Sequence, residues 1–546
     1  MGAGGVFLWK VREPVARSVY AEYVSGGAAG LYGDHFSDGA ARRQAVRRAR
    51  RPLSPRVADV VEAQCARLPV SPARDANLAA LRRGAAAVVT GQQVGLFLGP
   101  LFTIYKAASA VAAARQLSAE CGEPVVPVFW LQTEDHDLPE IAECHVPRAD
   151  AGVLTLRLPS SPDDRVSLAH RVLPNAVEGC IDDLAAEIGS LPFAATHIEH
   201  IREYYAPGAR WADAFAGLLA SLFADDGLVF IDPRDARLAD CAGPIHQRAL
   251  GEAAAIADSL TRRCQELEAA GFAPTVHIRA GAPLSFIHPL GATAPRYRLV
   301  PAASGFAEVG GGETVHDPAS LRSLLASDPA AFSTSVLLRP ILQDTLLPTA
   351  VFIGGPAEVA YFAQLPPLYA AYDMNMPIVL PRAGFRLIED KTAKLLARMG
   401  LQPADVACGE DELLAAVRAG LTGGDDAGDI SRRLLDPFEQ AMRDLRPRLE
   451  AEGQGLDAAI AKTQATVASA VAKLVAKVER ARLHRDETLV RDVRHLRQRL
   501  YPDGVPQERV FSLPYFAARY GEEEMVREII AAIEPFAPAV KDLALA

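Results

Sequence analysis

Four consecutive residues, Glu134-Asp135-His136-Asp137, place three carboxylates and one imidazole side by side. Such a cluster could bind Mg²⁺ through its carboxylates, orient a substrate amine, or supply a general base whose pKa is set by its neighbours. Alternatively, one or two of these residues cap the helix that the segment 138–141 predicts. We take all four as candidate catalytic residues, with His136 and at least one carboxylate as the acting groups.

A glycine-rich stretch from Thr90 to Lys106 holds the second group of candidate residues. Its glycines would let the backbone approach a ligand closely, and a helix beginning near Pro100 would offer N–H groups to an anion. The glutamines could bind an adenine, a sugar or an amino acid, or could instead satisfy the loop backbone, and the lysine could meet a phosphate or a carboxylate. The candidate binding residues are Thr90, Gly91, Gln92, Gln93, Gly95, Gly99 and Lys106.

A third group follows two later apolar runs. Arg339 and Arg382 could clamp a carboxylate through bidentate hydrogen bonds, or could be ordinary surface ion-pair residues. A glycine pair precedes a helix with proline in its first turn, as in a second strand, turn and helix of the same design. The candidate binding residues are Arg339, Gln343, Asp344, Gly354, Gly355, Glu358 and Arg382.

The elements that must position these residues begin with a β-α-β unit. The apolar run 86–90 predicts a strand, the spacing from Leu101 to Leu117 predicts a helix, and the run 125–131 predicts a second buried strand. Ligands of open α/β sheets bind beyond the carboxyl ends of the strands, where the polar clusters fall. Further strands are predicted at 153–158, 228–233, 336–342, 350–353 and 376–380, with a helix over 357–372 and an inserted β-rich or irregular region over 274–330.

Composition and motifs narrow the class of protein. A net charge of −10 and a pI near 5.7 give no overall attraction to nucleic acid or anionic membrane. The run 94–104 is too short to span a bilayer, and no signal-peptide core is present at the start, so we expect a cytoplasmic protein. The seven cysteines are widely spaced and are expected to be reduced thiols. His197 and His200 could suggest zinc, but we predict an ordinary polar helix face and no metal site of the protein's own.

Long helices are predicted after Phe385. Apolar residues between 456 and 500 recur mostly at alternating steps of four and three, as a coiled-coil seam requires. Arms of this kind often dimerise, so we expect a homodimer formed through the coiled coil. The alternative is an intramolecular hairpin with the segment 434–449.

Five segments together resemble the family of the bacillithiol biosynthesis enzyme BshC, a cysteine-adding enzyme. They occur in family order over nearly the whole chain, which makes the resemblance far more specific than a single glycine motif. The segments are TGQQVGLFLGPLFTIYK (90–106), PVFWLQTEDHD (127–137), LLRPILQDTLLPTAVFIGGPAEVAYFAQL (337–365), MPIVLPRA (376–383) and PDGVPQERVFSLPYFAARYG (502–521).

The resemblance implies an α/β fold, with a Rossmann-like parallel sheet core, connecting-peptide insertions and a C-terminal α-helical coiled-coil domain. This organisation is similar to that of class I aminoacyl-tRNA synthetases, although the sequence has no HIGH histidine and no KMSKS loop. We expect residues 1–150 and 331–384 to form the two parts of the core, and 151–330 an insertion with one core strand near 228–233. Residues 385–505 are expected to form the helical arm, and 506–546 a helical tail packing back on the core.

The resemblance also implies an activity. Members of the family are thought to join the carboxylate of L-cysteine to the amine of glucosaminyl-malate, the last step of bacillithiol biosynthesis. ATP with Mg²⁺ is the expected activator. The acidic cluster and the glycine turn would then serve the nucleotide and the amine, while an arginine would hold the malate carboxylates. Two alternatives also fit the residues: a non-catalytic nucleotide- or metabolite-binding assembly protein, and a related amino-acid ligase with another amine acceptor.

Overall fold

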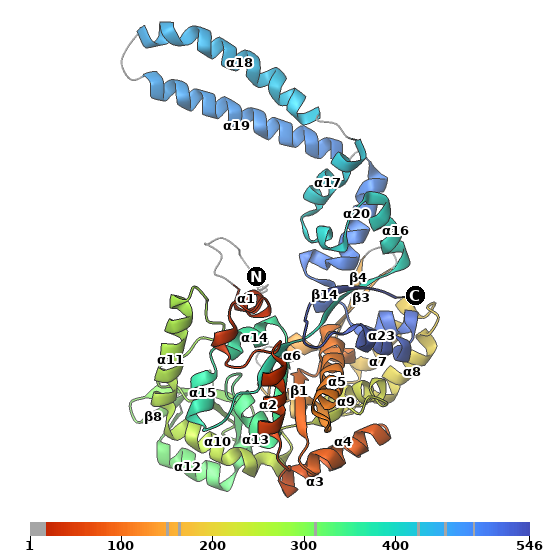
Figure 1. Ribbon diagram of the computed structural model, residues 1–546, viewed down its shortest axis with the longest axis vertical. Helices are drawn as coiled ribbons and strands as arrows, with labels where there is room; N and C mark the ends of the chain where they lie inside the picture. The colour runs from red at the N-terminus through yellow and green to blue at the C-terminus, as the bar shows by residue number, and fades with distance from the viewer. Residues whose placement is uncertain are drawn as a thin grey trace. The chain divides into compact units, whose positions relative to one another are not determined.

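The computed structural model describes residues 18–148, 152–161, 165–310, 314–422, 426–451, 456–483 and 486–545 (Figure 1). Within these ranges the chain divides into two compact units. The first contains residues 18–146, 154–385 and 511–543, and the second contains 147–153, 386–510 and 544–545.

The first unit is built on a parallel sheet with the strand order β12-β11-β1-β2-β5. Its strands are buried along almost their whole length, as expected for parallel strands joined by crossover helices. The chain runs from β1 outwards to β5 and then returns to β11 on the other side of β1, so the strand order reverses between β1 and β11. The strands are β1 (Ala86–Gln92), β2 (Val125–Leu131), β5 (Val229–Ile231), β11 (Thr349–Gly354) and β12 (Ile378–Pro381).

Helices of the first unit join and cover these strands. Helix α5 (Phe102–Cys121) connects β1 to β2, which pair in parallel from Ala86 opposite Val125 to Gln92 opposite Leu131. The remaining helices of the unit are α1 (Val19–Val24), α2 (Gly39–Ala49), α3 (Pro55–Cys65), α4 (Pro72–Arg82), α6 (Leu138–Ile141), α7 (Ala176–Ile188), α8 (Ala194–Tyr204), α9 (Trp211–Leu222), α10 (Ala239–Gly251), α11 (Ala253–Ala269), α12 (Pro318–Ser327), α13 (Arg339–Leu346), α14 (Pro356–Phe362), α15 (Pro366–Ala371), α22 (Leu513–Tyr520) and α23 (Glu522–Ala532).

The strands predicted from the runs near 86, 125, 228, 350 and 376 are confirmed, and the run at 153–158 forms β4 (Val153–Arg157), which pairs with β3 (Glu143–Pro147). The strand predicted over 336–342 is wrong, because this segment is a turn followed by the start of α13. Pro340 explains the difference. In the first turn of a helix its missing N–H costs no hydrogen bond, whereas in a central strand it would break the ladder.

The single helix predicted over 357–372 is also corrected. Two helices, α14 and α15, occupy this region, and the second begins at Pro366. A proline is favourable at the start of a helix but interrupts a continuing one, so the pair Pro366-Pro367 ends the first helix and begins the next.

An antiparallel sheet lies between β5 and β11 in the sequence, which confirms the β-rich character predicted for 274–330. Its order is β10-β6-β7-β8-β9. A small core of its own includes Ile287, Leu299 and Phe332, packed against Leu321 and Leu325 of α12. The strands are β6 (Ser285–Ile287), β7 (Tyr297–Ala302), β8 (Gly305–Val309), β9 (Val315–His316) and β10 (Phe332–Thr334).

Two buried histidines stabilise this inserted sheet in their neutral form. His246 Nδ1 lies 2.8 Å from Ser285 Oγ, and His288 Nε2 lies 3.0 Å from Ser333 Oγ. Burial, together with the positive charge of Arg234, lowers the pKa of each histidine to about 3. Both rings therefore stay uncharged in the folded protein at neutral pH.

We expect these histidines to make the protein less stable in acid. Below the pKa of about 6.5 that a histidine has in an unfolded chain, the unfolded state binds protons that the folded state does not bind until pH 3 is approached. Each histidine then lowers the free energy of unfolding by up to about 1.4 kcal/mol per pH unit. Urea unfolding at pH 7, 6 and 5 should show that His288→Gln has a shallower pH dependence than the wild type; equal slopes would contradict this account.

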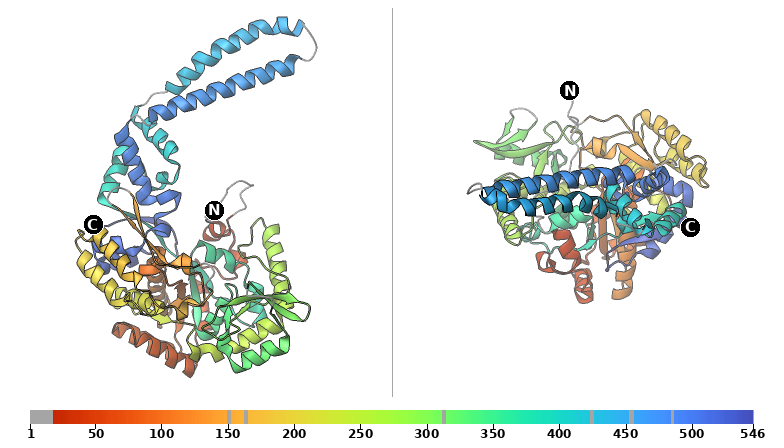
Figure 2. Two further views of the ribbon diagram at one scale, coloured as in Figure 1. Left: turned by 180° about the vertical axis from the view of Figure 1, so that it is seen from behind. Right: turned by 90° about the horizontal axis from the view of Figure 1, so that it is seen from above.

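The second unit is helical. Helices α16 (Asp390–Met399), α17 (Glu410–Thr422) and α20 (Glu487–Leu500) share a core that includes Leu396, Leu414 and Leu496. Two long helices, α18 (Asp426–Ala451) and α19 (Leu456–Leu483), lie side by side and antiparallel (Figures 1 and 2). The chain thus forms the intramolecular hairpin that was the alternative interpretation of the apolar spacing. Dimerisation through this hairpin stays a prediction. The unit also contains the short helix α21 (Gln507–Val510). Two further strands of the chain are β13 (Gly384–Ile388) and β14 (Val540–Ala544).

No helix in the described ranges is both long enough and apolar enough to cross a membrane.

Candidate functional site

The carboxyl ends of the parallel strands bring most of the candidate residues to one edge of the sheet. Because all five strands run in the same direction, residues far apart in the sequence meet there. Polar or glycine residues at or just after these ends include Gln92 of β1, Gln132 after β2, Asp232 after β5, Gly355 after β11 and Arg382 after β12.

A buried lysine lies at the point where the strand order reverses. Lys106 Nζ donates to the carbonyl of Gly91 and to Gln92 Oε1, both at 2.9 Å, and forms an ion pair with Glu358. The same carboxylate accepts a hydrogen bond of 2.8 Å from the N–H of Gly355. Burial lowers the pKa of Lys106, while the charge of Glu358 opposes this shift. The lysine therefore holds the ends of β1 and α14 together.

The glycines of the β1–α5 turn are required by packing within the protein. A Cβ atom on Gly91 would lie 2.6 Å from the carbonyl oxygen of Trp130, and one on Gly95 would lie 2.8 Å from the Cα atom of Gly99. Gly99 also has a φ of +64°, which favours glycine. Gly95 and Gly99 are buried and do not line the cavity described below.

The start of α5 is also occupied by protein. The N–H of Leu101 donates to the carbonyl of Phe511 at 2.8 Å, so this N–H is not open to an anion as the sequence had suggested. Thr90 is fully buried, and its hydroxyl donates to the carbonyl of Ile353 at 3.1 Å, which links β1 to β11. Leu101 and Thr90 therefore stabilise the fold around the site and do not bind a ligand through these groups.

The acidic cluster after β2 divides into residues with different partners. Glu134 is buried, accepts a hydrogen bond of 3.1 Å from the N–H of Thr334 and is also bonded to the Thr334 hydroxyl. Asp137 caps α6 by accepting a hydrogen bond of 3.3 Å from the N–H of Glu140. Asp137 therefore has the helix-capping role that was the alternative to catalysis. Glu134 instead links the parallel sheet to the inserted sheet through Thr334.

Asp135 and His136 form the pair that faces open space. Asp135 accepts hydrogen bonds of 2.8 Å from Gln93 Nε2 and 2.7 Å from the N–H of His136, whose Nδ1 lies 3.5 Å from the same carboxylate. Partial burial works to raise the pKa of Asp135, but the interaction with His136 and the charge of Arg296 hold it well below its usual range. Asp135 is thus an ionised carboxylate beside an imidazole, and about a third of each side chain (37% and 32%) is exposed.

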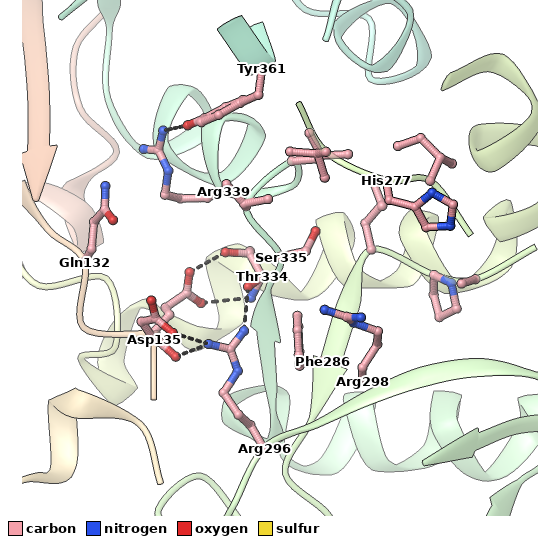
Figure 3. A pocket seen from close by; sticks show the side chains of 18 of the residues that line it. Gln132, Asp135, His277, Phe286, Arg296, Arg298, Thr334, Ser335, Arg339 and Tyr361 are labelled. Carbon is pink, nitrogen blue, oxygen red and sulfur yellow. Dashed lines mark hydrogen bonds and ion pairs between the residues drawn. The ribbon is translucent and has the colours of Figure 1, made fainter. Parts of the chain in front are cut away.

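A cavity of about 590 Å³ opens beside this pair (Figure 3). The parallel sheet contributes one wall, and the inserted sheet with the segment before β6 contributes the opposite wall. The polar residues that line it are Gln132, Glu134, Asp135, His136, Thr275, His277, Arg279, Arg296, Arg298, Thr334, Ser335, Arg339, Glu358 and Tyr361.

Arg339 is held firmly at the cavity wall. Its Nη1 donates to Gln343 Oε1 at 2.7 Å, and its Nη2 donates to the Tyr361 hydroxyl at 2.9 Å. Gln343 Nε2 in turn donates to Asp344 Oδ1 at 2.9 Å, and the Tyr369 hydroxyl donates to Asp344 Oδ2 at 2.5 Å. Gln343 and Asp344 do not reach the cavity and instead position Arg339.

Arg382 lies at the end of β12, away from the cavity lining. Its N–H donates to the carbonyl of Gly354 at 2.9 Å, and its guanidinium donates to the carbonyl of Ala383 at 2.8 Å. The positive charges of both Arg382 and Arg339 act on Lys106, so the three cations and Glu358 form one charged group around the switch point.

Sequence reasoning missed the arginines of the inserted sheet. Arg296 is buried, and its guanidinium lies 3.9 Å from the centre of the Phe286 ring, 3.0 Å from the carbonyl of Thr334 and 4.0 Å from Asp135. Arg298 is two residues further along the chain, in β7, and lines the same cavity. Two arginines at strand spacing in an acidic protein are a signal that could have indicated them.

The histidine pair on α8 has a carboxylate partner. His197 Nδ1 and His200 Nδ1 both face Glu522, the latter at 2.8 Å, which ties α8 to the start of α23. In the described part of the chain, no group of three His, Cys, Asp or Glu side chains is placed to hold a metal ion.

The sequence matches known families over nearly its whole length. Residues 16–383 match the N-terminal Rossmann-like domain of bacillithiol biosynthesis BshC, and residues 385–541 match its C-terminal coiled-coil domain. Similar proteins from several bacteria carry the name "Putative cysteine ligase BshC", and three of them illustrate the match. The protein from Koribacter versatilis is 36% identical over 466 residues, 85% of each chain. That from Salinibacter ruber is 33% identical over 490 residues, 89% of this chain and 88% of the relative.

The third relative, from Geobacillus thermodenitrificans, is 29% identical over 524 residues, 94% of this chain and 96% of its own. Both parts of the predicted fold class, the Rossmann-like α/β core and the C-terminal coiled-coil domain, are confirmed by these matches and by the parallel sheet. The chain therefore belongs to the BshC family of bacillithiol biosynthesis proteins.

Proposed function

We propose that this chain is a ligase that forms an amide bond between the carboxyl group of L-cysteine and the amine of glucosaminyl-malate. The observation that carries the proposal is the cavity at the carboxyl end of β2, where an ionised carboxylate and an imidazole face a wall of arginines. Such a site suits an amine and several anionic groups at once. The relatives named as cysteine ligases give the reaction class.

The reaction requires activation of cysteine, because a carboxylate at neutral pH is a poor electrophile. Transfer of the adenylyl or γ-phosphoryl group of ATP to a carboxylate oxygen, with release of pyrophosphate or ADP, would turn that oxygen into a leaving group. The amine then forms the new C–N bond, the C–O bond to the activated oxygen breaks, and the amine proton passes to a base. Arg339, which lies at the wall, suits the negative charge of an activated carboxyl or a phosphate.

Mg²⁺ fits this site only as an ion that is bound together with the nucleotide phosphates. An ion bound through phosphate oxygens and water needs one or two protein carboxylates. Asp135 is the ionised carboxylate that is open to the cavity, whereas Glu134 is engaged by Thr334. Asp135 would therefore be the protein ligand of such an ion, or the group that holds the substrate ammonium.

His136 is the group best placed to accept the amine proton. It lines the cavity, and Asp135 beside it orients the ring and stabilises the imidazolium that forms. Of the two arginines predicted to clamp a substrate carboxylate, Arg339 lines the cavity and Arg382 does not, so Arg339 is the candidate that remains. Full activity in Arg339→Ala would contradict the clamp.

The direct test uses the purified chain with cysteine, glucosaminyl-malate, ATP and Mg²⁺, followed by mass spectrometry of thiol products and nucleotides. Product together with AMP would indicate an adenylate, and product together with ADP would indicate an acyl phosphate. Other amines, beginning with glucosamine, test whether the chain is a ligase with another acceptor. Nucleotide binding without any product would favour the non-catalytic assembly role. A cytoplasmic setting suits the thiol substrate and the seven free cysteines.

We also propose that two chains associate through the α18–α19 hairpin. Leu434, Leu445, Leu456 and Leu474 remain exposed on it, by 43, 45, 37 and 50%. Burying such residues against a second hairpin would stabilise a dimer.

Substituting one of these leucines with a charged residue should therefore shift the protein from dimer to monomer. Leu474→Glu tests this in light scattering after gel filtration, because a buried carboxylate would oppose association. Val70→Glu, at a site in the first unit that is 87% exposed, is the matched control and should leave the mass unchanged. A monomeric wild type, or a dimeric Leu474→Glu, would rule out this interface.

A further inference from the structure

The inserted sheet presents a row of side chains to the cavity (Figure 3). Arg296 immediately precedes β7 and Arg298 lies in it, and residues two apart in extended chain point to the same face, so both line the cavity. Phe286 of β6 pairs with Arg298 in the sheet. The centre of its ring lies 3.9 Å from the Arg296 guanidinium and 5.7 Å from that of Arg298. Asp135, Arg296, Phe286 and Arg298 therefore follow one another along the wall.

The carboxylates of the cavity already have partners. Glu134 is bonded to Thr334, Asp135 to Gln93 and His136, and Glu358 to Lys106. Each accepts from groups that are fixed in the folded protein. On the opposite wall, Arg296 lies 4.0 Å from Asp135, but no ion pair among the described residues joins these carboxylates to Arg279 or Arg298.

The cavity arginines differ in their partners. Arg296 is buried and donates to backbone carbonyls, and Arg339 is bonded to Gln343 and Tyr361. Arg279 and Arg298 are exposed to the cavity, and neither forms an ion pair with any residue in the described ranges. Their two charges lie close enough that burial and Arg279 together lower the pKa of Arg298. The wall thus carries two adjacent positive charges that lack protein counterions.

We propose that Arg279 and Arg298 form a binding site for a dianion, and that its ligand is the dicarboxylate end of the amine acceptor. This assignment rests on the proposed function. Two guanidinium groups match two carboxylates in charge and in hydrogen-bonding geometry. With its malyl carboxylates at these arginines, the acceptor extends past Phe286 and brings its amine towards Asp135 and His136. The arginine pair thereby selects a dicarboxylate-bearing amine over a neutral amino sugar.

The same charges would also suit nucleotide phosphates, so the test measures the two ligands separately. Titration calorimetry is performed on the full chain with glucosaminyl-malate and with ATP–Mg²⁺. The proteins are the wild type, Arg279→Gln, Arg298→Gln and the double variant. Arg322→Gln is the matched control, because Arg322 is an exposed arginine of α12 that does not line the cavity.

Each single variant should weaken binding of glucosaminyl-malate by about ten- to a hundredfold, the range expected for one lost hydrogen bond between charged groups. ATP binding should be unchanged, and the control should match the wild type for both ligands. Arg298→Lys should recover part of the lost affinity, since it keeps the charge but loses the bidentate geometry. Glucosamine, which lacks the malyl group, should bind the wild type and the double variant with the same low affinity.

Unchanged affinity for glucosaminyl-malate in the double variant would overturn the proposal, as would absence of acceptor binding by the wild type. Loss of ATP affinity instead would assign the pair to the nucleotide phosphates and would also overturn it. Failure of the proposed function has a different signature: the wild type would bind the acceptor through these arginines yet form no amide with cysteine and ATP.

Discussion

Replacing His136 with alanine should lower kcat for amide formation by about 10²–10⁴-fold, the usual contribution of a positioned general base. The substitution removes the only imidazole of the acidic cluster, and with it the group that accepts the amine proton. Binding of ATP should be little affected, because Arg339, the group proposed for a phosphate, keeps its hydrogen bonds to Gln343 and Tyr361. Steady-state kinetics with saturating substrates separates the two effects.

The control for this variant is Asp137→Asn. Asp137 caps α6 and does not line the cavity, and asparagine caps a helix as well as aspartate does. Its kcat should stay close to that of the wild type. If folded His136→Ala kept full activity, or if Asp137→Asn lost as much activity, the assignment of the base would be wrong.

Lys106→Met should lower the free energy of unfolding of the first unit by about 3–5 kcal/mol, the range expected when one partner of a buried ion pair is removed. Lys106 is 2% exposed, and its loss leaves the Glu358 carboxylate without its counterion beside β11 and α14. The carbonyl of Gly91 and Gln92 Oε1 lose their donor as well. Urea unfolding followed by tryptophan fluorescence, which reports on Trp130 and Trp211 of the first unit, measures the change.

A double-mutant cycle tests whether the pair itself is responsible. Glu358→Gln removes the charge but keeps a side chain of similar size, and the double variant Lys106→Met/Glu358→Gln leaves no unpaired charge. The double variant should therefore be more stable than the sum of the single changes predicts. Strict additivity would show that Lys106 and Glu358 act independently, contrary to the geometry.

Most of the parallel sheet could be predicted because its strands are short, continuous apolar runs that end at glycine or charged residues. The run over 336–342 has the same composition and yet begins a helix. Apolar composition alone does not distinguish a buried strand from a buried turn and helix, and Pro340 was the residue that should have decided it. The sequence could not decide between a dimeric coiled coil and the hairpin of α18 and α19 for a similar reason. An apolar seam shows that another helix covers it but not whether that helix belongs to the same chain.

The site was predictable only where it depends on the direction of the strands. Parallel strands must place Asp135, His136 and Gly355 on one edge, whatever the rest of the chain does. Arg296 and Arg298 reach that edge through an inserted sheet whose position depends on tertiary packing. The glycines near Gly95 were predicted to bind a ligand but pack against backbone instead. The sequence cannot distinguish these two roles, because both require the absence of a side chain.

The central claim is that this chain activates the carboxyl group of cysteine and transfers it to an amine in the cavity beside Asp135 and His136. The most direct measurement supplies cysteine labelled with ¹⁸O in its carboxylate, together with glucosaminyl-malate, ATP and Mg²⁺. Mass spectrometry then follows the label. The account predicts one ¹⁸O atom in AMP or inorganic phosphate for every amide formed, and no such transfer by His136→Ala beyond its residual turnover. Absence of amide, or amide formed without transfer of label to AMP or inorganic phosphate, would contradict it.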